Sequence, residues 1–100
     1  MSNFKEELSK VKAFVFDVDG VLSDAKIYLH PGNELMRSMN IKDGYAIQYA
    51  IRKGYPVGII TGGNSEAVEK RFRNLGVSDI YLKSRDKRDN LQDFLAKHKI

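Results

Sequence analysis

Two carboxylates separated by one residue are the feature of this sequence that most directly suggests chemistry. Asp17 and Asp19 follow an apolar run and precede Gly20. Aspartate supplies a nucleophilic oxygen, a group that donates or accepts a proton, or a hard oxygen ligand for a divalent cation. Gly20 lets the backbone turn sharply and approach a ligand closely. Taken alone, an Asp at the end of a strand is also a common turn former or helix cap, so that alternative stays open.

Two groups suited to binding an anion follow later in the chain. Thr61, Gly62 and Gly63 place a hydroxyl and backbone N–H groups ahead of an expected helix, which is a suitable cradle for phosphate. Lys87 adds a cation. Phosphoryl transfer needs groups of these kinds to converge on one phosphate. The plain alternatives are a simple turn at residues 61–63 and a solvated side chain at Lys87.

Alternating strands and helices are expected to position these groups. Short apolar runs predict strands, and amphipathic stripes predict helices. The predicted strands are residues 11–16, 55–60 and 80–82, and the predicted helices are residues 43–53, 64–75 and 86–99. This order favours right-handed βαβ units and an α/β fold with a doubly wound, Rossmann-like parallel sheet. In such sheets ligands bind at the carboxyl ends of the strands, which is where Asp17 and Thr61 stand.

One insertion interrupts the alternation. Residues 25–29 and 35–39 flank a turn at residues 30–34 that contains Pro and Gly, which predicts a β-hairpin over residues 25–39. Its apolar side chains pack either on their own domain or on neighbouring subunits, and the sequence leaves both open. They are Ile27, Tyr28, Leu29, Leu35 and Met36.

Composition restricts the class of protein. The 100 residues are 42% hydrophobic and 30% charged, which is typical of one globular domain spanning residues 1–100. The absence of cysteine excludes disulfides and thiolate metal sites. No apolar run approaches the roughly 20 residues that span a bilayer, and residues 1–10 lack a signal-peptide pattern. A cytoplasmic location with no membrane partner is therefore expected.

Net charge points to a small anion as the partner. The formal net charge is +4 and the sequence pI is about 9.4. Because the Lys and Arg residues are scattered and mixed with acids, nucleic-acid binding is not expected. A phosphorylated small molecule suits a basic surface of this kind.

The motifs together resemble a known superfamily. Residues 14–24, with the pattern DxDGVL[ST]D, resemble the first signature of the haloacid dehalogenase superfamily. Residues 59–62 resemble its second signature, and Lys87 stands in the place of the third. The hairpin, residues 40–47 and the segment around residues 80–87 are similar to the 3-deoxy-D-manno-octulosonate 8-phosphate phosphatase family. That resemblance implies a capless fold and a homotetramer assembled through the hairpins.

The resemblance also implies roles for the candidate residues. Asp17 would attack phosphorus and form an aspartyl-phosphate, while Asp19 would act as general acid and base. Thr61 and Lys87 would bind the phosphoryl oxygens, with Gly62 and Gly63 beside them. Asp17 and Asp19 would hold Mg²⁺. The implied substrate is a phosphorylated sugar acid of lipopolysaccharide precursor synthesis. An eight-carbon acid is favoured over a nine-carbon acid, because Gly63 stands where the nine-carbon branch tends to carry an acidic residue.

Four further positions carry softer expectations. Arg71 would meet anionic groups of the substrate, or it is simply a surface arginine. Asp43 and Gly44 match the family pattern, but they also suit the start of a helix. Asp24 is expected to accept backbone N–H bonds within its loop.

The sequence departs from the family at one signature. The fourth, an acidic Gly-Asp-Asp stretch that supplies the remaining magnesium ligands, is missing. We expect the chain to be part of a longer protein, or else a short form that lost the complete metal site. The main functional alternative is thus a non-catalytic module that oligomerises or holds an anion. Asp86, Asp89 and Asp93 are not expected to replace the missing ligands, because helical spacing directs them away from the strand ends.

Overall fold

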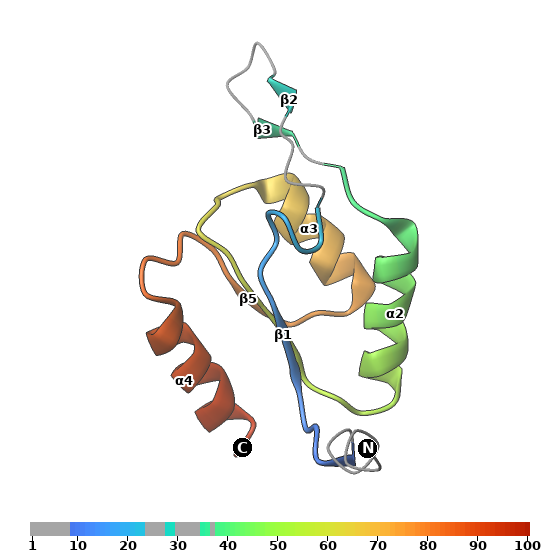
Figure 1. Cartoon of the computed structure of the whole chain (residues 1–100), viewed down its shortest axis with the longest axis vertical. Coiled ribbons are helices and arrows are strands. Elements are labelled where there is room, and N and C mark those ends of the chain that lie inside the picture. The colour runs from blue at the N-terminus through green and yellow to red at the C-terminus, as the bar shows by residue number, and fades with distance from the viewer. Residues whose placement is uncertain (1–8, 24–27, 30–34, 37) are drawn as a thin grey trace, which may run out of the picture.

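A parallel sheet of three strands lies at the centre of the fold (Figure 1). The strands are β1 (Phe14–Phe16), β4 (Val57–Ile60) and β5 (Asp79–Tyr81), in the order β1-β4-β5. Every residue of β4 is buried, as expected of a central strand in such a sheet. Because the strands are parallel, the loops that follow them meet at one edge. The computed structural model describes residues 9–23, 28–29, 35–36 and 38–100.

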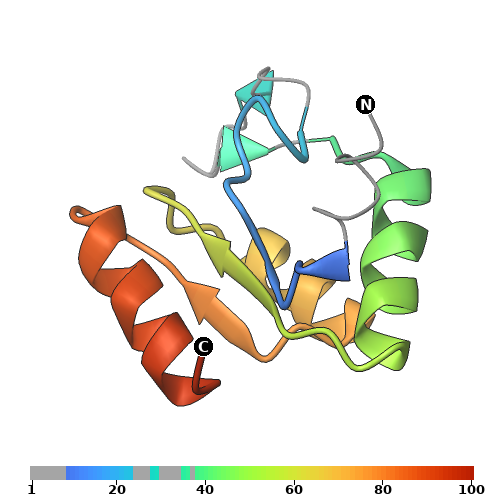
Figure 2. The same cartoon turned by 60° about the horizontal axis from the view of Figure 1, so that its bottom comes forward.

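In the described part of the chain, three helices cover the two faces of this sheet. Helices α2 (Ile41–Arg52) and α3 (Glu66–Leu75) lie on one face, and α4 (Lys87–Lys97) lies on the other (Figure 2). The main apolar core lies between the sheet and the first two helices. Its buried members are Val18, Leu22, Ile47, Val57, Ile59, Val68, Phe72, Leu75 and Val77.

Local sequence signals define where the helices begin and end. The side chains of Asn40, Ser65 and Asp86 accept hydrogen bonds from backbone N–H groups in the first turns of α2, α3 and α4. These N-caps satisfy donors that a helix leaves unpaired. Gly76 ends α3 with a φ of 102°, a left-handed conformation that glycine adopts without strain. All six predicted elements outside the hairpin are confirmed, with ends that differ by up to three residues.

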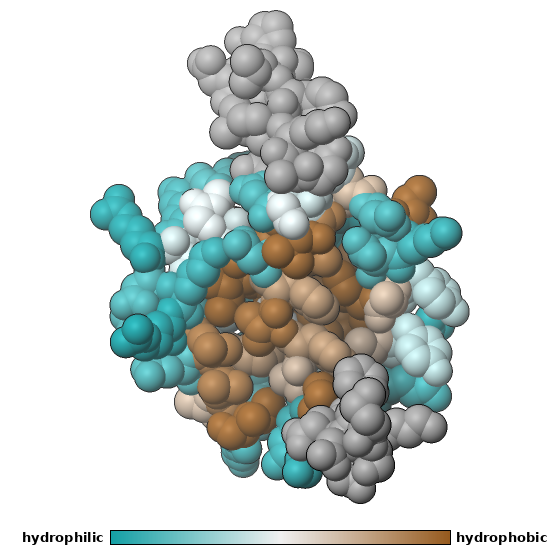
Figure 3. Space-filling view, in the orientation of Figure 1, coloured by the Kyte–Doolittle hydropathy of each residue, from teal (hydrophilic) through white to brown (hydrophobic). Residues whose placement is uncertain are grey.

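The first strand is only partly buried in the described part of the chain. Strand β1 pairs only with β4, so it forms an edge of the described sheet. Phe14 and Phe16 are partly buried, and Val15 is 37% exposed. Figure 3 shows hydrophobic side chains gathered on the face of the molecule that β1 crosses. The apolar run at residues 11–16 was therefore a correct signal for a strand, and its burial depends on neighbours outside the run.

Antiparallel pairing is present in the predicted hairpin. Strand β2 (Tyr28–Leu29) pairs with β3 (Leu35–Met36), and a further antiparallel bridge joins Ser23 to Met39. Asp24 and the turn at residues 30–34 lie outside the described residues, so the expected role of Asp24 and the bounds 25–39 stay predictions.

Two finer points of the predicted fold class are untested. The three described strands follow one another in chain order, so they do not reveal the reversal that defines a doubly wound sheet. The absence of a cap domain likewise stays a prediction. In the described part of the chain, no helix has the length and hydrophobicity needed to cross a bilayer.

A buried carboxylate fastens the C-terminal end of α4 to the sheet. Asp79, whose side chain is 3% exposed, accepts hydrogen bonds from Lys97 and, at 2.7 Å, from Nε2 of His98. Burial raises the pKa of this carboxyl, but the hydrogen bonds from Lys97 and His98 outweigh burial and hold the pKa below its usual value. The ion pairs therefore stabilise α4 on the sheet while Asp79 is ionised.

This cluster predicts an acid-sensitive component of stability. A carboxyl with a lowered folded pKa contributes stability above its unfolded pKa of about 3.9, and the contribution is lost as pH falls through the folded pKa. Asp79→Asn should lower the free energy of unfolding by about 1–3 kcal/mol at pH 7 and flatten its decline below about pH 4. Urea unfolding across pH measures both effects. The exposed Asp89, changed to Asn, is the control; an equal effect there would contradict the assignment.

A second contact that holds α4 on the sheet is made by a glycine of the central strand, β4. A Cβ atom at Gly58 would lie 2.9 Å from Cε1 and 3.0 Å from Cδ1 of Phe94, whose ring is fully buried. Gly58→Ala should therefore cost about 1–3 kcal/mol, the usual range for overpacking a core. Thermal unfolding measures this loss.

Gly44→Ala is the matched control for that substitution. A Cβ at Gly44 would come 2.6 Å from Nη2 of Arg71, the mobile end of a flexible side chain that can move aside. The helix also gains up to about 1 kcal/mol from Ala in place of Gly. Gly44→Ala should therefore be neutral or slightly stabilising, and equal losses at the two glycines would show that the Phe94 contact is not the cause.

Candidate active site

Asp17 is the first residue after β1, and the backbone of the next residue orients its carboxylate. The N–H of Val18 donates to Oδ1 of Asp17 at 2.7 Å, which fixes the orientation of the carboxylate. The chain then turns tightly, because the carbonyl of Val18 accepts hydrogen bonds from the N–H groups of residues 21–23. Gly20, with a φ of 79°, supplies the left-handed residue that this turn uses. Asp19 lies on the exposed side of the same turn.

Thr61 stands at the equivalent position after β4, where two loops are joined. Its side chain is buried, and its Oγ1 accepts a hydrogen bond from the N–H of Gly63 at 3.2 Å. The loop after β5 binds back to it: Ser84 N–H donates to the Thr61 carbonyl, and Lys83 N–H donates to the Gly63 carbonyl, both at 2.9 Å. These two hydrogen bonds join the loop after β4 to the segment that leads from β5 to Lys87.

Lys87 follows Asp17 by 70 positions in the sequence, and its side chain reaches the Asp17 carboxylate. Its Nζ donates to Oδ2 of Asp17 at 2.7 Å. It is the first residue of α4, a helix start fixed by the Asp86 cap. The hydrogen bond from Lys87 is the main reason that the pKa of Asp17 is lowered; burial opposes it and the Val18 N–H assists it. Asp17 is therefore held as a carboxylate, the form that a nucleophile or a metal ligand needs.

The oxygen donors at this turn suit a magnesium ion in part. Mg²⁺ keeps several waters and is bound by one or two carboxylates together with phosphate oxygens. Asp17 provides a carboxylate of that kind, and Asp19 adds a backbone carbonyl on the same turn. No cluster of three His, Cys, Asp or Glu side chains with metal-binding geometry occurs among the described residues. These two oxygen donors fit a site that water, phosphate and further ligands complete.

Two of the three acidic residues of α4 and its cap, Asp86 and Asp93, accept hydrogen bonds in that region. Asp86 accepts hydrogen bonds from the N–H groups at residues 88 and 89. Asp93 accepts a hydrogen bond from the Tyr81 hydroxyl at 2.7 Å. Burial, followed by this contact with Asp93, raises the pKa of Tyr81 to about 12. These contacts hold α4 and its cap in place and supply no ligand to the turn at Asp17.

The structure does not test the substrate contacts expected of Arg71 and Gly62. The Arg71 guanidinium lies against Gly44 in the first turns of α2, and no contact described for it reaches Asp17 or Lys87. Gly62 is exposed, and a Cβ there would meet only the Ser84 carbonyl at 3.7 Å, an ordinary contact. The backbone at Gly62 can serve a ligand without the loop requiring a glycine. The substrate contacts expected of both residues stay predictions.

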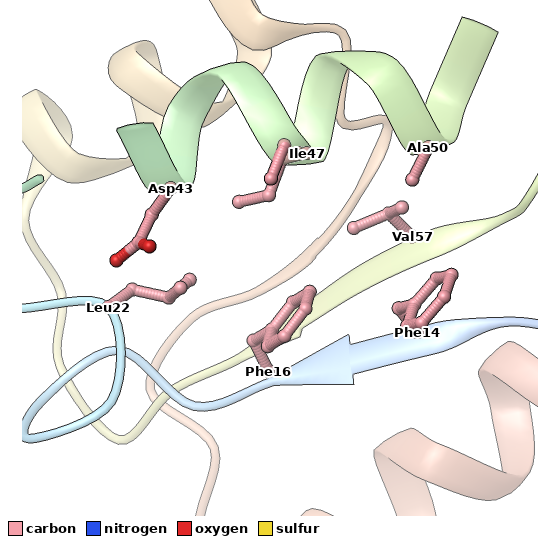
Figure 4. Close-up of a pocket in the computed structure, with 8 residues that line it drawn as sticks. Phe14, Phe16, Leu22, Asp43, Ile47, Ala50 and Val57 are labelled. Atoms are coloured by element: carbon pink, nitrogen blue, oxygen red, sulfur yellow. The ribbon is translucent and has the colours of Figure 1, made fainter. Parts of the chain in front are cut away.

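An apolar hollow of about 300 Å³ lies beside this site, between β1 and α2 (Figure 4). Figure 4 shows Phe14, Phe16, Ile47 and Val57 facing into it, with Asp43 at one end. Its walls offer almost no polar atoms, so it does not suit the phosphate that the strand ends would hold.

Comparison with known proteins identifies the family. No family model matches the chain. The 3-deoxy-D-manno-octulosonate 8-phosphate phosphatase KdsC of Escherichia coli K12 is 37% identical over 87 residues, which are 87% of this chain and 46% of the relative. The phosphatase of that name from Yersinia pestis has a crystal structure that matches 94% of this chain with a TM-score of 0.90 and 32% identity. The chain belongs to the KdsC-like group of the haloacid dehalogenase superfamily.

The KdsC-like relatives are about twice as long as this chain. The match covers 51% of the Yersinia pestis structure, so the chain spans about half the length of the relatives it matches. A second solved structure, of the 3-deoxy-D-manno-octulosonate 8-phosphate phosphatase from Moraxella catarrhalis, matches 100% of this chain and 57% of its own with a TM-score of 0.91 and 31% identity. That structure is a complex with a magnesium ion, a phosphate ion and a KDO molecule.

Sequence reasoning missed two features, one at the opposite end of the sheet and one beside the site. The Asp79 cluster that fastens α4 joins residues 18 and 19 positions apart, and Asp79 carried no local sign of burial beyond its place before an apolar run. The hydroxyl of Ser23, at the [ST] position of the first motif, is buried without a described partner. Its small polar side chain within that motif was the available signal.

Proposed function

We propose that the chain acts in a magnesium-dependent phosphomonoester hydrolase whose substrate is a phosphorylated sugar acid, 3-deoxy-D-manno-octulosonate 8-phosphate. The observation that carries the proposal is the convergence of Asp17, Lys87 and the Thr61 loop at one edge of a parallel sheet. Family membership supports the reaction class, and the ligands named for the Moraxella catarrhalis relative support the substrate class.

The proposed reaction begins with an attack by the Asp17 carboxylate on phosphorus. The bond from phosphorus to the sugar oxygen breaks, and Asp19 donates a proton to the departing alkoxide. Asp19 then removes a proton from water, which attacks the aspartyl-phosphate and releases inorganic phosphate. Two steps of moderate barrier thus replace one difficult displacement.

Other groups would bind the phosphate and balance its charge. Thr61, with the backbone N–H groups of Gly62 and Gly63, would bind phosphoryl oxygens, and Lys87 would offset charge that develops during transfer. The Asp17 carboxylate and the backbone carbonyl of Asp19 would hold Mg²⁺, which supplies further charge neutralisation when bound. The positive charge of Arg71 suits the sugar carboxylate, so we assign it that role within the proposal.

Phosphate release from 3-deoxy-D-manno-octulosonate 8-phosphate, with Mg²⁺ and with a chelator, tests the function. Release that requires Mg²⁺ supports the hydrolase. A non-catalytic anion-binding module is the alternative, favoured by the absence of a three-ligand acidic cluster among the described residues. That module would bind phosphate without releasing it from the ester, and phosphate binding with no turnover would replace the first proposal by the second.

Assembly into a homotetramer through the hairpin at residues 25–39 is part of the same proposal, as is a cytoplasmic location. Antiparallel pairing of β2 with β3 gives the hairpin two strands that a neighbouring subunit can extend. Light scattering at micromolar concentration tests the assembly, and a monomer would contradict it.

A further inference from the structure

Ser84 forms hydrogen bonds with two of the segments that meet at the site. Its backbone N–H donates to the Thr61 carbonyl at 2.9 Å, which ties it to the loop after β4. Its side-chain Oγ donates to Oδ1 of Asn90, the fourth residue of α4. Ser84 and Asn90 are both partly buried, so their hydrogen bond is shielded from competing water. Ser84 therefore connects the loop at Thr61 to the helix that carries Lys87.

The backbone next to Ser84 has a strained conformation. Lys83 has a φ of 54°, in the left-handed region that residues with a Cβ atom rarely adopt. Such conformations persist where surrounding contacts hold them, and they are concentrated at functional sites. Here the contacts are two hydrogen bonds from this segment to the loop after β4, both at 2.9 Å. The course of the chain from β5 to α4 is thus fixed at Ser84.

Helix geometry relates the Asn90 contact to Lys87. The two residues are three positions apart in α4, so their side chains lie on one face of the helix. The hydrogen bond from Ser84 to Asn90 spans the Asp86 cap, from two residues before it to four residues after it. An apolar contact across a helix start fixes the angle at which the chain enters the helix. We expect this hydrogen bond to do the same on the face from which Lys87 reaches Asp17.

Lys87 benefits from a fixed helix start because its side chain is long and half exposed. That side chain is 52% exposed, and its Nζ lies 2.7 Å from Oδ2 of Asp17. A flexible lysine loses rotamer freedom when its ammonium group is held at one place. A helix start held at one angle confines the positions that Nζ can reach, so less freedom remains to be lost when an anion binds.

We propose that Ser84 is a positioning residue for phosphate binding: its side-chain hydrogen bond to Asn90 holds the start of α4 where Lys87 reaches a phosphate beside Asp17. The proposal rests on the proposed function, because it requires phosphate to bind at Asp17 and Lys87. Ser84 acts through Lys87 and contacts neither the phosphate nor the reacting atoms. The effect of the Ser84 hydroxyl on phosphate affinity should therefore disappear when the Lys87 ammonium group is removed.

Calorimetric titration of the full chain with inorganic phosphate and Mg²⁺ tests this coupling. Lys87→Met, which removes the charge and keeps most of the stem, should weaken phosphate binding by at least about tenfold. Ser84→Ala should weaken it by about threefold to tenfold, as expected for one lost hydrogen bond. The double variant should match Lys87→Met within about twofold, because the two residues act as one unit. Ser84→Thr keeps the hydroxyl and should restore the affinity of the parent chain.

Tyr81→Phe is the matched control, because it removes another hydrogen bond between the end of β5 and α4. The Tyr81 hydroxyl donates to Asp93 at 2.7 Å, about one helical turn beyond Asn90. Tyr81→Phe should lower the unfolding temperature about as much as Ser84→Ala does, and it should leave phosphate affinity within about twofold.

The outcomes separate this role from the function on which it rests. Unchanged phosphate affinity in Ser84→Ala, an equal loss in Tyr81→Phe, or independent losses in the double variant would overturn the proposal and leave the hydrolase assignment standing. Failure of Ser84→Thr to restore affinity would also overturn it. Absence of phosphate binding by the parent chain would overturn the proposed function and the role of Ser84 together.

Discussion

Replacement of Asp17 by Asn is expected to reduce phosphate release by at least about a thousandfold, to the level without protein. An amide does not form the covalent bond to phosphorus that an aspartyl-phosphate requires, so the route through the intermediate is closed. Loss of a nucleophile from a set of groups that act together has effects of this size or larger in other enzymes. Release of phosphate from 3-deoxy-D-manno-octulosonate 8-phosphate with Mg²⁺ measures the change.

The same substitution should leave the fold intact. The side chains of Asp17 and Lys87 are 39% and 52% exposed, and ion pairs with that exposure contribute little to stability. Asn also retains an oxygen that can accept the hydrogen bond from the Val18 N–H. Asp89→Asn makes the same change of charge on the exposed side of α4 and should keep full activity. Substantial turnover in Asp17→Asn, or an equal loss in Asp89→Asn, would remove Asp17 from the role of nucleophile.

The sequence alone predicted that Asp17, Thr61 and Lys87 lie at one edge of the sheet. This arrangement depends on regular features of the fold. Alternating strands and helices imply parallel strands, and parallel strands place the residues that follow them at one edge. Asp17 and Thr61 each follow the last residue of a strand, so their proximity required only the correct order of elements. Lys87 was singled out because it stands in the place of the third signature, and its 2.7 Å contact with Asp17 shows that it reaches the same edge.

Features that depend on contacts between distant segments were not predictable in this way. The exposure of β1 depends on which strands flank it, and the alternation of residues within 11–16 carries no such information. The contact of Gly58 with Phe94 joins a strand to a helix 36 positions later, and neither residue marks the other. Likewise, the position of Arg71 against Gly44 depends on how α2 and α3 pack together, which no local pattern in the sequence indicates.

The packing of α4 connects stability to the site, since this helix carries Lys87. Phe94 is fully buried on the inner face of α4, over Gly58 of β4, and its ring lies 4.7 Å from the ring of His98. Because β4 has no side chain at Gly58, the Phe94 ring fills that space. The apolar contact of this ring, together with the Asp79 cluster, holds the helix on its face of the sheet.

Phe94→Ala should therefore lower the free energy of unfolding by about 3–5 kcal/mol, the range for removing a buried phenyl ring. Domains of this size are stable by only about 5–15 kcal/mol, so the variant should approach the unfolding threshold near 37 °C. Urea unfolding measures the loss. Leu91→Ala on the same helix is the control, because Leu91 is 37% exposed and its truncation should cost well under half as much.

A second readout distinguishes loss of the helix from global unfolding. If α4 leaves the sheet first, Lys87 separates from Asp17 while β4 and the core around Phe72 persist. In Phe94→Ala, amide exchange should then be faster across residues 87–97 than across β4, and phosphate binding should weaken before the sheet unfolds. Uniform exchange over both segments would show instead that α4 and the sheet unfold as one unit, and that the position of Lys87 is as stable as the core itself.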